Sequence, residues 1–374
     1  MTGAMRWGIL GAGSMAARFA RDLSYSEHGQ LVAIASRNPQ RAAQMVQAPG
    51  IAGHGARAFA NYAALVADDS VDAVYIATPP KLHREHALLA IAAGKAVLCE
   101  KPLAASVEDA QAIAKAAHAA NVFCMEALWT RFLPAFIAVE RQIKSLGPLR
   151  QINAQLGFPR IARAGDPVTD MGLGGGALND LGVYPLALAS VLAGPLRLVS
   201  CYVTRGDGLV DTIRDAAALL VADESGVIVS MSVSHATHFS NRFEIIGEAG
   251  RMTIDAPFIE ALGLRHVPIA AMDHRSGDTS GRVAVALKGG RLWPLLRGAR
   301  RHLRHPDGPH SSYGYRGTGL QFQADEVARC LNCNLIASPL FSLDTSLDVY
   351  SLVAQIEISA PPAQVSDDSP AHST

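Results

Sequence analysis

A glycine-rich turn near the start of the chain has the residue spacing of a dinucleotide-binding loop. Trp7 to Leu10 is a short apolar run, Gly11 to Ala16 reads G-A-G-S-M-A, and a helical stretch follows. In such a turn Gly11 permits the tight bend, Gly13 lets the backbone approach a pyrophosphate, and Ala16 keeps helix and strand close. The N-terminus of the helix offers free N–H groups to the phosphates. The residues predicted to contact the phosphates are Gly11, Gly13, Ser14 and Met15.

The residues after the next predicted strand, Leu31 to Ala35, indicate which dinucleotide fits. A protein that binds NAD typically has Asp or Glu here, to hold the ribose 2′-hydroxyl. This chain has Ser36-Arg37-Asn38 instead. A hydroxyl and a guanidinium can bind a 2′-phosphate, which a carboxylate would repel. We therefore expect NADP, with NAD possible, and Ser36 and Arg37 at the phosphate. The alternative interpretation makes Arg37 a solvated turn residue.

Alternating strands and helices must hold these residues in place. Beyond the first two strands, the strands and helices expected in the first third of the chain are 72–78, 83–93, 96–100 and 106–119. This alternation predicts a doubly wound parallel sheet, with the ligand crevice at the carboxyl ends of its strands. Thr78, Pro79 and Glu100 lie at such ends, and Lys101 follows directly.

From Leu149 the apolar pattern changes to a period of two, which is typical of strands with one buried face. The strands expected are 151–157, 199–204, 216–222, 227–234, 242–246 and 251–254, and the helices are 180–192, 321–331 and 344–358. The pattern predicts an α/β chain in three parts. Residues 1–124 form a Rossmann domain, 125–360 form an α+β domain with a large, mainly antiparallel open sheet, and 361–374 form a disordered tail.

Composition narrows the class of protein. The 374 residues are 49% hydrophobic and 18% charged, with a formal net charge of zero, so nothing points to nucleic acid. No apolar run reaches the roughly 18–20 residues of a membrane helix, and we expect no leader before the first strand. We expect a cytoplasmic protein with a small-molecule substrate. Cys330 and Cys333 have a metal-like spacing but no second pair, so no metal site is predicted.

Several motifs occur together. Glu100-Lys101-Pro102 closes a strand, and residues 77–83 read A-T-P-P-K-L-H. Residues 125–132 read M-E-A-L-W-T-R-F, and residues 174–185 read G-G-G-A-L-N-D-L-G-V-Y-P. With 244–251 and 323–328, the combination resembles the glucose–fructose oxidoreductase, inositol dehydrogenase and MocA family (Gfo/Idh/MocA). Within it, the chain looks like the dimeric dihydrodiol dehydrogenases and the NADP-linked aldose (xylose-type) dehydrogenases. The likeness covers most of residues 5–358.

The resemblance implies a set of site residues. Lys101 and Tyr184 would be the catalytic pair with Asp180 beside them, although the family often has His where Tyr184 stands. It also implies a cis Lys101–Pro102 bond, and a homodimer that forms through the open face of the sheet. Further cofactor contacts would be Thr78, Pro79, His83, Glu100 and Lys101. Candidates for the substrate wall are Trp129, Arg131 and Phe158, with core packing as the alternative.

Hydride transfer to or from an alcohol carbon needs a group that exchanges the hydroxyl proton. Free tyrosine titrates near ~10, and a nearby ammonium favours the phenolate and lowers the pKa. Tyr184 is therefore predicted as the acid/base with Lys101 as its electrostatic partner; the alternative makes Lys101 the direct proton carrier. Asp180 shares a face with Tyr184 if the segment is helical. It would bind a substrate hydroxyl or orient Lys101.

The expected activity is NADP(H)-dependent hydride transfer at a hydroxyl or carbonyl carbon of an aldose or a trans-dihydrodiol. Two alternatives stay open, a family dehydrogenase for an inositol-like or amino-sugar substrate and a non-catalytic dinucleotide-sensing regulator. Residues 282–305 contain seven Arg or Lys and no acid. We expect this segment to be solvated or to pack on its own domain; the alternative is an amphipathic helix on a membrane surface or an acidic partner.

Overall fold

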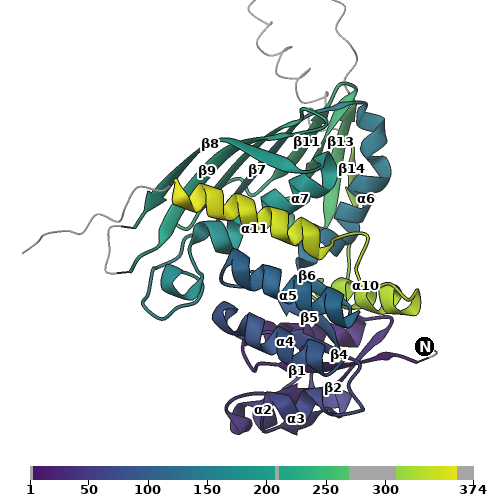
Figure 1. The fold of residues 1–374 in the computed structure, drawn as a ribbon. Helices are drawn as coiled ribbons and strands as arrows, with labels where there is room; N and C mark the ends of the chain where they lie inside the picture. The colour runs from purple at the N-terminus through teal and green to yellow at the C-terminus, as the bar shows by residue number, and fades with distance from the viewer. Residues whose placement is uncertain (1–2, 207–209, 269–308, 360–374) are drawn as a thin grey trace, which may run out of the picture.

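Six parallel strands form the N-terminal sheet of the computed structural model, which describes residues 3–206, 210–268 and 309–359 (Figure 1). The strands are β1 (Met5–Leu10), β2 (Gly29–Ala35), β3 (Arg57–Phe59), β4 (Ala73–Ile76), β5 (Ala96–Glu100) and β6 (Cys124–Ala127). Their order, β3-β2-β1-β4-β5-β6, is that of a Rossmann fold. The predicted fold of this part is confirmed. The short edge strands β3 and β6 were not predicted.

Helices cover both faces of this sheet because its strands are apolar on both sides. They are α1 (Ser14–Asp22), α2 (Pro39–Val46), α3 (Tyr62–Val66), α4 (His83–Ala92) and α5 (Val107–Ala120). Buried residues of α1 and α2 share one core with one face, and those of α3, α4 and α5 share another with the opposite face. Helix α5 begins as expected, since Oγ of Ser106 accepts a hydrogen bond from N–H of Asp109 at 3.2 Å.

The second sheet has eight strands in the order β14-β13-β12-β11-β7-β10-β9-β8. They are β7 (Leu149–Gly157), β8 (Leu196–Arg205), β9 (Ile213–Ala222), β10 (Ile228–Ser234), β11 (Phe243–Gly247), β12 (Gly250–Ile254), β13 (Gly263–Pro268) and β14 (His310–Ser312). Among the described strands of this second sheet, only β7 and β10 pair in parallel, so the predicted, mainly antiparallel sheet is confirmed. The strands β13 and β14, at one end of this sheet, were not predicted.

Four helices accompany the second sheet and join it to the first. They are α6 (Pro134–Gln142), α7 (Val183–Ala193), α10 (Gln321–Asn332) and α11 (Leu343–Ile358). Figure 1 shows α11 running across the helix layer of the second sheet, where it packs on α7 and β8 and also reaches α5 and β6. Helix α10 packs against β2. Helices α10 and α11 of the C-terminal part therefore hold the two units together, and one continuous hydrophobic core extends through both.

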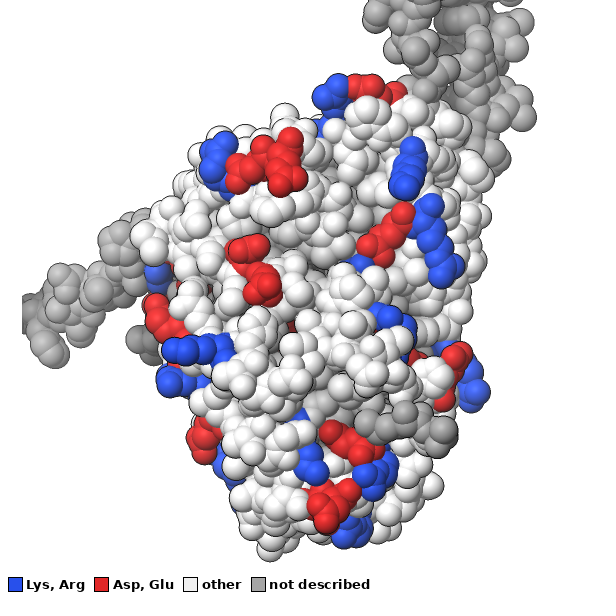
Figure 2. All heavy atoms as spheres, turned by 45° about the vertical axis from the view of Figure 1, so that its right-hand side comes forward, with Lys and Arg blue, Asp and Glu red and all other residues white. Residues whose placement is uncertain are grey.

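Some predictions made from the sequence are not tested by the described residues. The basic segment 282–305 and the tail 361–374 fall outside the described residues, and the domain limits at 124 and 360 remain predictions. Within the described part of the chain, no helix is long and apolar enough to cross a membrane, and no cluster of three or more potential ligands could hold a metal ion. On the face shown in Figure 2, the described Lys and Arg side chains are interspersed with Asp and Glu.

Candidate functional site

A cavity of about 810 Å³ lies between the two units, at the carboxyl ends of the parallel strands. Both units contribute walls to it, the first through the ends of β1, β2, β4 and β5, and the second through segments around α7 and β7. The predicted site residues that line the cavity are Gly11, Gly13, Ser14, Met15, Ser36, Arg37, Thr78, Pro79, Glu100, Lys101, Trp129, Phe158, Asp180 and Tyr184. The structure thus brings together fourteen side chains or backbone positions from segments far apart in the sequence.

The glycine-rich turn has the geometry that a pyrophosphate needs. Gly11 has φ of 119°, and a Cβ there would lie 2.5 Å from the main-chain oxygen of Ala77, so only glycine fits. Gly13 differs, because a Cβ there would meet no atom within 4 Å. The turn therefore leaves open space beside Gly13 and above the start of α1, whose N-cap has no side-chain hydrogen bond. Free N–H groups at this helix end fit the phosphates of a dinucleotide.

The end of β2 presents cationic groups to the same cavity. Ser36 is buried, Arg37 is exposed, and both line the cavity together with Arg41. Asn38 caps α2, since its Oδ1 accepts from N–H of Gln40 at 3.0 Å. The cap fixes the start of α2, whose first turn contains Arg41. A hydroxyl and two guanidinium groups can hold a 2′-phosphate.

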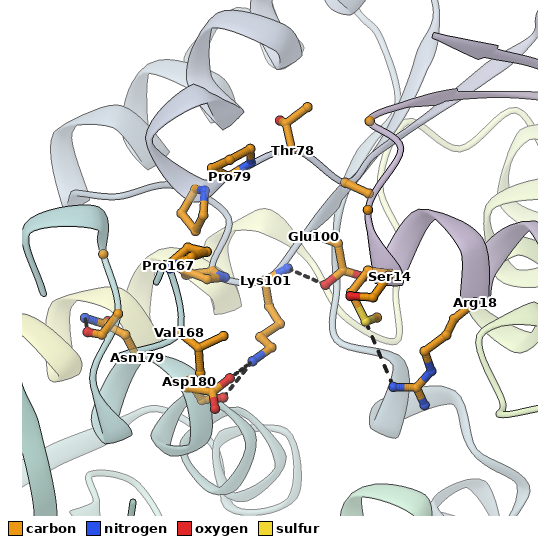
Figure 3. Close-up of a pocket in the computed structure, with 18 of the residues that line it drawn as sticks. Ser14, Arg18, Thr78, Pro79, Glu100, Lys101, Pro167, Val168, Asn179 and Asp180 are labelled. Atoms are coloured by element: carbon orange, nitrogen blue, oxygen red, sulfur yellow. Dashed lines mark hydrogen bonds and ion pairs between the residues drawn. The ribbon is translucent and has the colours of Figure 1, made fainter. Parts of the chain in front are cut away.

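Lys101 and Asp180 meet in the deep part of the cavity (Figure 3). The Nζ atom of Lys101 donates to Oδ1 of Asp180 at 2.6 Å and to its main-chain oxygen at 2.7 Å. Lys101 follows β5, with a cis bond to Pro102, and Asp180 lies in a π-helical turn (Leu178–Gly182) that precedes α7. Such turns widen a helix locally and are frequent at functional sites. The predicted helix thus begins as a π turn, in which Oδ1 and the main-chain oxygen of Asp180 both face Lys101.

The two charges of this pair stabilise each other. Burial disfavours both charged forms, but the Asp180 carboxylate outweighs burial and raises the pKa of the Lys101 ammonium above its ordinary range. Lys101 likewise outweighs burial at Asp180, and with His235 it holds the pKa of that carboxyl below its usual range. Both groups are therefore charged throughout the neutral pH range. A lysine in this state provides a fixed positive charge.

Tyr184 is the second residue of α7 and lies beside this charge. The Lys101 Nζ atom is 5.1 Å from the centroid of the Tyr184 ring, and the tyrosine oxygen accepts a hydrogen bond from Nε1 of Trp129 at 3.2 Å. Burial raises the pKa of Tyr184, and Lys101 is the largest influence that opposes it. The expected lowering is therefore wrong in its net direction, because desolvation of the phenolate outweighs the attraction of the ammonium. The hydroxyl is protonated at neutral pH.

Glu100 forms the floor of the cavity next to Lys101. Oε2 of Glu100 accepts from N–H of Lys101 at 3.2 Å, and the buried hydroxyl of Tyr75 donates to Oε1. Burial raises the pKa of Glu100 to about 7. A second carboxyl group therefore lies near the catalytic candidates and titrates close to neutral pH.

Two predicted site residues do not line the cavity. His83 is 1% exposed, and its ring nitrogens lie 2.8 Å from the oxygen of Pro102 and 2.7 Å from that of Thr78. It joins the ends of β4 and β5 from behind the cavity wall. Arg131 is also 1% exposed; its Nε donates to the oxygen of Leu340 at 2.9 Å and its Nη2 to Glu140 at 2.7 Å. Because Nε and Nη2 are both bound to groups inside the protein and Arg131 does not line the cavity, its side chain is turned away from the substrate side.

Sequence reasoning missed several residues of the site. Arg18 lines the cavity one turn after Ser14 on α1, so helical periodicity could have identified it. Asn179 precedes Asp180 and donates to Oε1 of Glu357 at 2.7 Å. Other lining residues that were missed are Arg41, Tyr62, Arg160, Pro167, Val168, Pro257, Ile259 and Glu260. No local pattern marks those of the second unit, because the packing of the units brings them to the cavity.

The glycine run before Asp180 packs tightly against another loop. Gly174 and Gly176 have φ of 86° and 97°, and a Cβ on Gly175 would lie 2.7 Å from the carbonyl carbon of Val168. Positive φ values of this kind favour glycine at Gly174 and Gly176. Val168, Gly174 and Gly175 all line the cavity, so this contact forms the wall next to Pro79 and Lys101.

Comparisons with known proteins agree with this geometry. The family model described as "Oxidoreductase family, NAD-binding Rossmann fold" matches residues 5–128, and the "GFO/IDH/MocA C-terminal domain" matches residues 141–253. Trans-1,2-dihydrobenzene-1,2-diol dehydrogenase of Sus scrofa is 30% identical over 351 residues, covering 92% of this chain and 93% of the relative. The enzyme of that name from Mus musculus is 35% identical over 261 residues, covering 67% and 74%.

Solved structures show the same fold. A 3-ketoreductase from Actinomadura kijaniata in complex with NADP and TDP-benzene has a TM-score of 0.73 at 23% identity, covering 96% of this chain and 98% of that one. An aldose-aldose oxidoreductase from Caulobacter crescentus complexed with glycerol has a TM-score of 0.73 at 22% identity, covering 95% and 97%. Both likenesses extend over the two units described above.

Proposed function

The chain belongs to the Gfo/Idh/MocA oxidoreductase family and is an NAD(P)-dependent oxidoreductase, and from this premise we propose its finer activity. It transfers a hydride between NADP(H) and the hydroxyl or carbonyl carbon of an aldose or a trans-dihydrodiol, with Tyr184 as the acid/base and Lys101 as its partner. The observation that carries the proposal is the contact of Lys101 with Asp180 beside Tyr184, in the cavity that the glycine-rich turn opens.

Tyr184 is the proton carrier in this proposal because its protonated hydroxyl is the better acid. The Lys101 ammonium is bound to two oxygens of Asp180 and its pKa is raised, so it gives up a proton reluctantly. When bound, the nicotinamide supplies or takes up the hydride, and its oxidised form adds a positive charge to the site. In reduction, Tyr184 donates its proton to the substrate oxygen. In oxidation, Lys101 favours the phenolate that accepts the proton.

Preference for NADP is supported by the end of β2. Ser36, Arg37 and Arg41 line the cavity there, and the turn from residue 36 to 38 contains no carboxylate that would repel a 2′-phosphate. The pyrophosphate would lie against Gly13 and the start of α1, and the nicotinamide end would reach Thr78, Pro79 and Glu100. The 3-ketoreductase of similar fold was solved with NADP.

The proposed substrate class follows from the aromatic side chains that line the cavity near Tyr184. Trp129 is 4% exposed, and Phe158 is half-buried. Aromatic walls suit the C–H face of a sugar or a cyclic diol. The relatives named trans-1,2-dihydrobenzene-1,2-diol dehydrogenase support the diol, and the aldose-aldose oxidoreductase of similar fold supports the sugar.

A homodimer is also part of the proposal. The helices lie on one face of the second sheet (Figure 1). Three neighbouring strands, β8, β9 and β10, expose apolar side chains to solvent. Tyr202 on β8 is 73% exposed, Ile228 on β10 is 47% exposed, and Leu219 on β9 is 38% exposed. Large exposed apolar side chains on neighbouring strands are typical of a protein interface. A second copy of the chain packed face to face would cover them.

The proposed activity is tested by titrating the purified protein with NADPH and with NADH, and then assaying turnover through nicotinamide absorbance. The panel contains aldoses, trans-dihydrodiols, inositols and dicarbonyls. We expect turnover with NADP(H) on an aldose or a diol. Turnover confined to inositols would contradict the substrate class, and tight NADPH binding without turnover on any compound would contradict catalysis.

A further inference from the structure

His235 lies behind the cavity, against the candidate catalytic group. It follows β10 directly and is 4% exposed. Its backbone is held on both sides, because its N–H donates to the oxygen of Arg214 at 2.7 Å and its own oxygen accepts from N–H of Arg160 at 2.8 Å. His235 is not among the residues that line the cavity, so it is placed to act on Asp180 and not on a substrate.

The Asp180 carboxylate is held at both of its oxygens. Nζ of Lys101 donates to Oδ1 at 2.6 Å, and Nε2 of His235 lies 3.1 Å from Oδ2. The two contacts connect the end of β5, the π turn and the end of β10. Removal of either one would leave a buried carboxylate oxygen without that donor, and the carboxylate could then rotate.

The surroundings of the ring indicate which nitrogen carries the proton. The Asp180 carboxylate can only accept, so His235 must donate from Nε2–H. Nδ1 is buried and has no hydrogen-bond partner among the described residues. The geometry therefore makes Nε2–H of His235 the donor of one hydrogen bond to Asp180.

We propose that His235 is a positioning residue for the reaction, which fixes the Asp180 carboxylate so that it holds the Lys101 ammonium beside Tyr184. The inference rests on the proposed function of that pair. Lysine has a flexible four-carbon stem, so the place of its charge depends on the acceptor that binds it. A displacement of a catalytic group by about 1 Å can lower a rate by about 100-fold. His235 thus controls the rate without contact with the substrate.

Two amide variants distinguish the effect of losing the hydrogen bond to Asp180 from the effect of losing the imidazole ring. In His235→Gln the side-chain amide reaches the place of Nε2 and keeps a donor for Asp180. In His235→Asn the amide reaches only the place of Nδ1 and cannot. We expect kcat to fall by about 10-fold to 100-fold in the Asn variant and by at most about threefold in the Gln variant. The NADPH Kd and the substrate KM should stay within about twofold in both.

A matched control uses a histidine–aspartate contact elsewhere in the protein. His310 Nε2 lies 2.6 Å from Oδ2 of Asp255, and neither residue lines the cavity. His310→Asn should leave kcat unchanged. Melting curves of all variants show whether each is folded, and if the Asn variant does not fold, His235→Leu replaces it with the same expected loss. Wild-type kcat in the Asn or Leu variant, or equal losses in the Asn and Gln variants, would overturn the proposal.

A double-variant cycle shows whether His235 acts through Asp180. If it does, Asp180→Asn combined with His235→Asn loses no more activity than Asp180→Asn alone, because the group that His235 positions is already changed. Losses that multiply would overturn the proposal. Wild-type turnover is the reference rate throughout. No turnover by the wild type would contradict the proposed function and this inference with it, whereas equal turnover by the wild type and the Asn variant contradicts only this inference.

Discussion

The Nζ atom of Lys101 donates to two oxygens of Asp180, to Oδ1 at 2.6 Å and to the main-chain oxygen at 2.7 Å. The two residues are 79 positions apart and come from different units of the fold. Because the ammonium is held by both oxygens, its charge stays beside Tyr184 and its proton is retained. This contact determines the roles that we assign to the three residues and leads to most of the predictions below.

Replacement of the tyrosine hydroxyl should abolish the acid/base step. For Tyr184→Phe we expect turnover to fall at least about 100-fold with the NADPH Kd unchanged, because the ring still packs but cannot exchange a proton. Steady-state kinetics and an NADPH titration measure both. Tyr25→Phe, at an exposed tyrosine, is the matched control. A Tyr184→Phe rate near that of the wild type would remove Tyr184 from the mechanism.

Replacement of the lysine charge should affect both rate and pH dependence. Lys101→Met keeps the length of the side chain, and we expect turnover to fall at least about 100-fold. Since the ammonium opposes the effect of burial on Tyr184, its loss raises the pKa of the tyrosine further. The rise of the oxidation rate with pH should then move to higher pH in the variant. A pH–rate profile measures this, with the exposed Lys115→Met as the control. An unmoved profile would mean that Lys101 does not act on Tyr184.

Arg37 should discriminate between the two dinucleotides. For Arg37→Ala we expect the NADPH Kd to rise by about 10-fold or more, since a charge-assisted hydrogen bond to the 2′-phosphate is lost. The NADH Kd should change little. Fluorescence titrations with both cofactors test this, and Arg84→Ala, which breaks an exposed ion pair with Asp109, is the control. Equal losses for both cofactors would place Arg37 away from the 2′-phosphate.

The buried Glu100 should make the stability of the protein depend on pH. Burial raises its pKa from 4.5 to about 7 in the folded protein, so the folded state binds the proton more tightly than the unfolded state. Its contribution to the free energy of unfolding is therefore fully present below pH 4.5 and is lost as the pH rises through about 7. Glu100→Gln keeps an acceptor for Tyr75 and cannot ionise.

Urea unfolding of the wild type and of Glu100→Gln on both sides of this pH window measures the effect. Relative to the wild type, the Gln variant should gain stability as the pH rises through the window, because it does not bury a charge. Glu108→Gln, at an exposed position on α5, is the control. A difference between wild type and Gln variant that does not change with pH would contradict the raised pKa.

The exposed face of the second sheet should hold two copies together. A charge at its most exposed aromatic residue, in Tyr202→Glu, should convert the dimer to a monomer, since an unpaired carboxylate would be buried in an apolar interface. Light scattering during size-exclusion chromatography gives the mass. Leu262→Glu, at another exposed apolar position, should leave the dimer intact. A wild-type mass of one chain would contradict the dimer itself.

The parts of the fold that local rules control could be predicted from the sequence. The turn from Gly11 to Ala16 needs glycine at fixed places, and Ser106 caps α5 because a free N–H three residues on requires an acceptor. Strands β7 to β12 follow from the alternation of buried and exposed residues. The short strands β3, β13 and β14 could not be predicted, because three to six residues carry little pattern and their pairing depends on a neighbouring strand.

Only the tertiary structure decides how the site is completed. The sequence indicates Lys101, Asp180 and Tyr184 as a set, but the π turn that aims Asp180 at Lys101 depends on how the segment packs. Arg131 stands in a motif that suggests a substrate contact, but its Nε and Nη2 instead bind Leu340 and Glu140 inside the protein. His235 reaches Asp180 from a strand end 55 residues away, with no local signal. Burial, which sets the pKa of Tyr184, is likewise a property of the assembled units, since desolvation depends on every segment that excludes water.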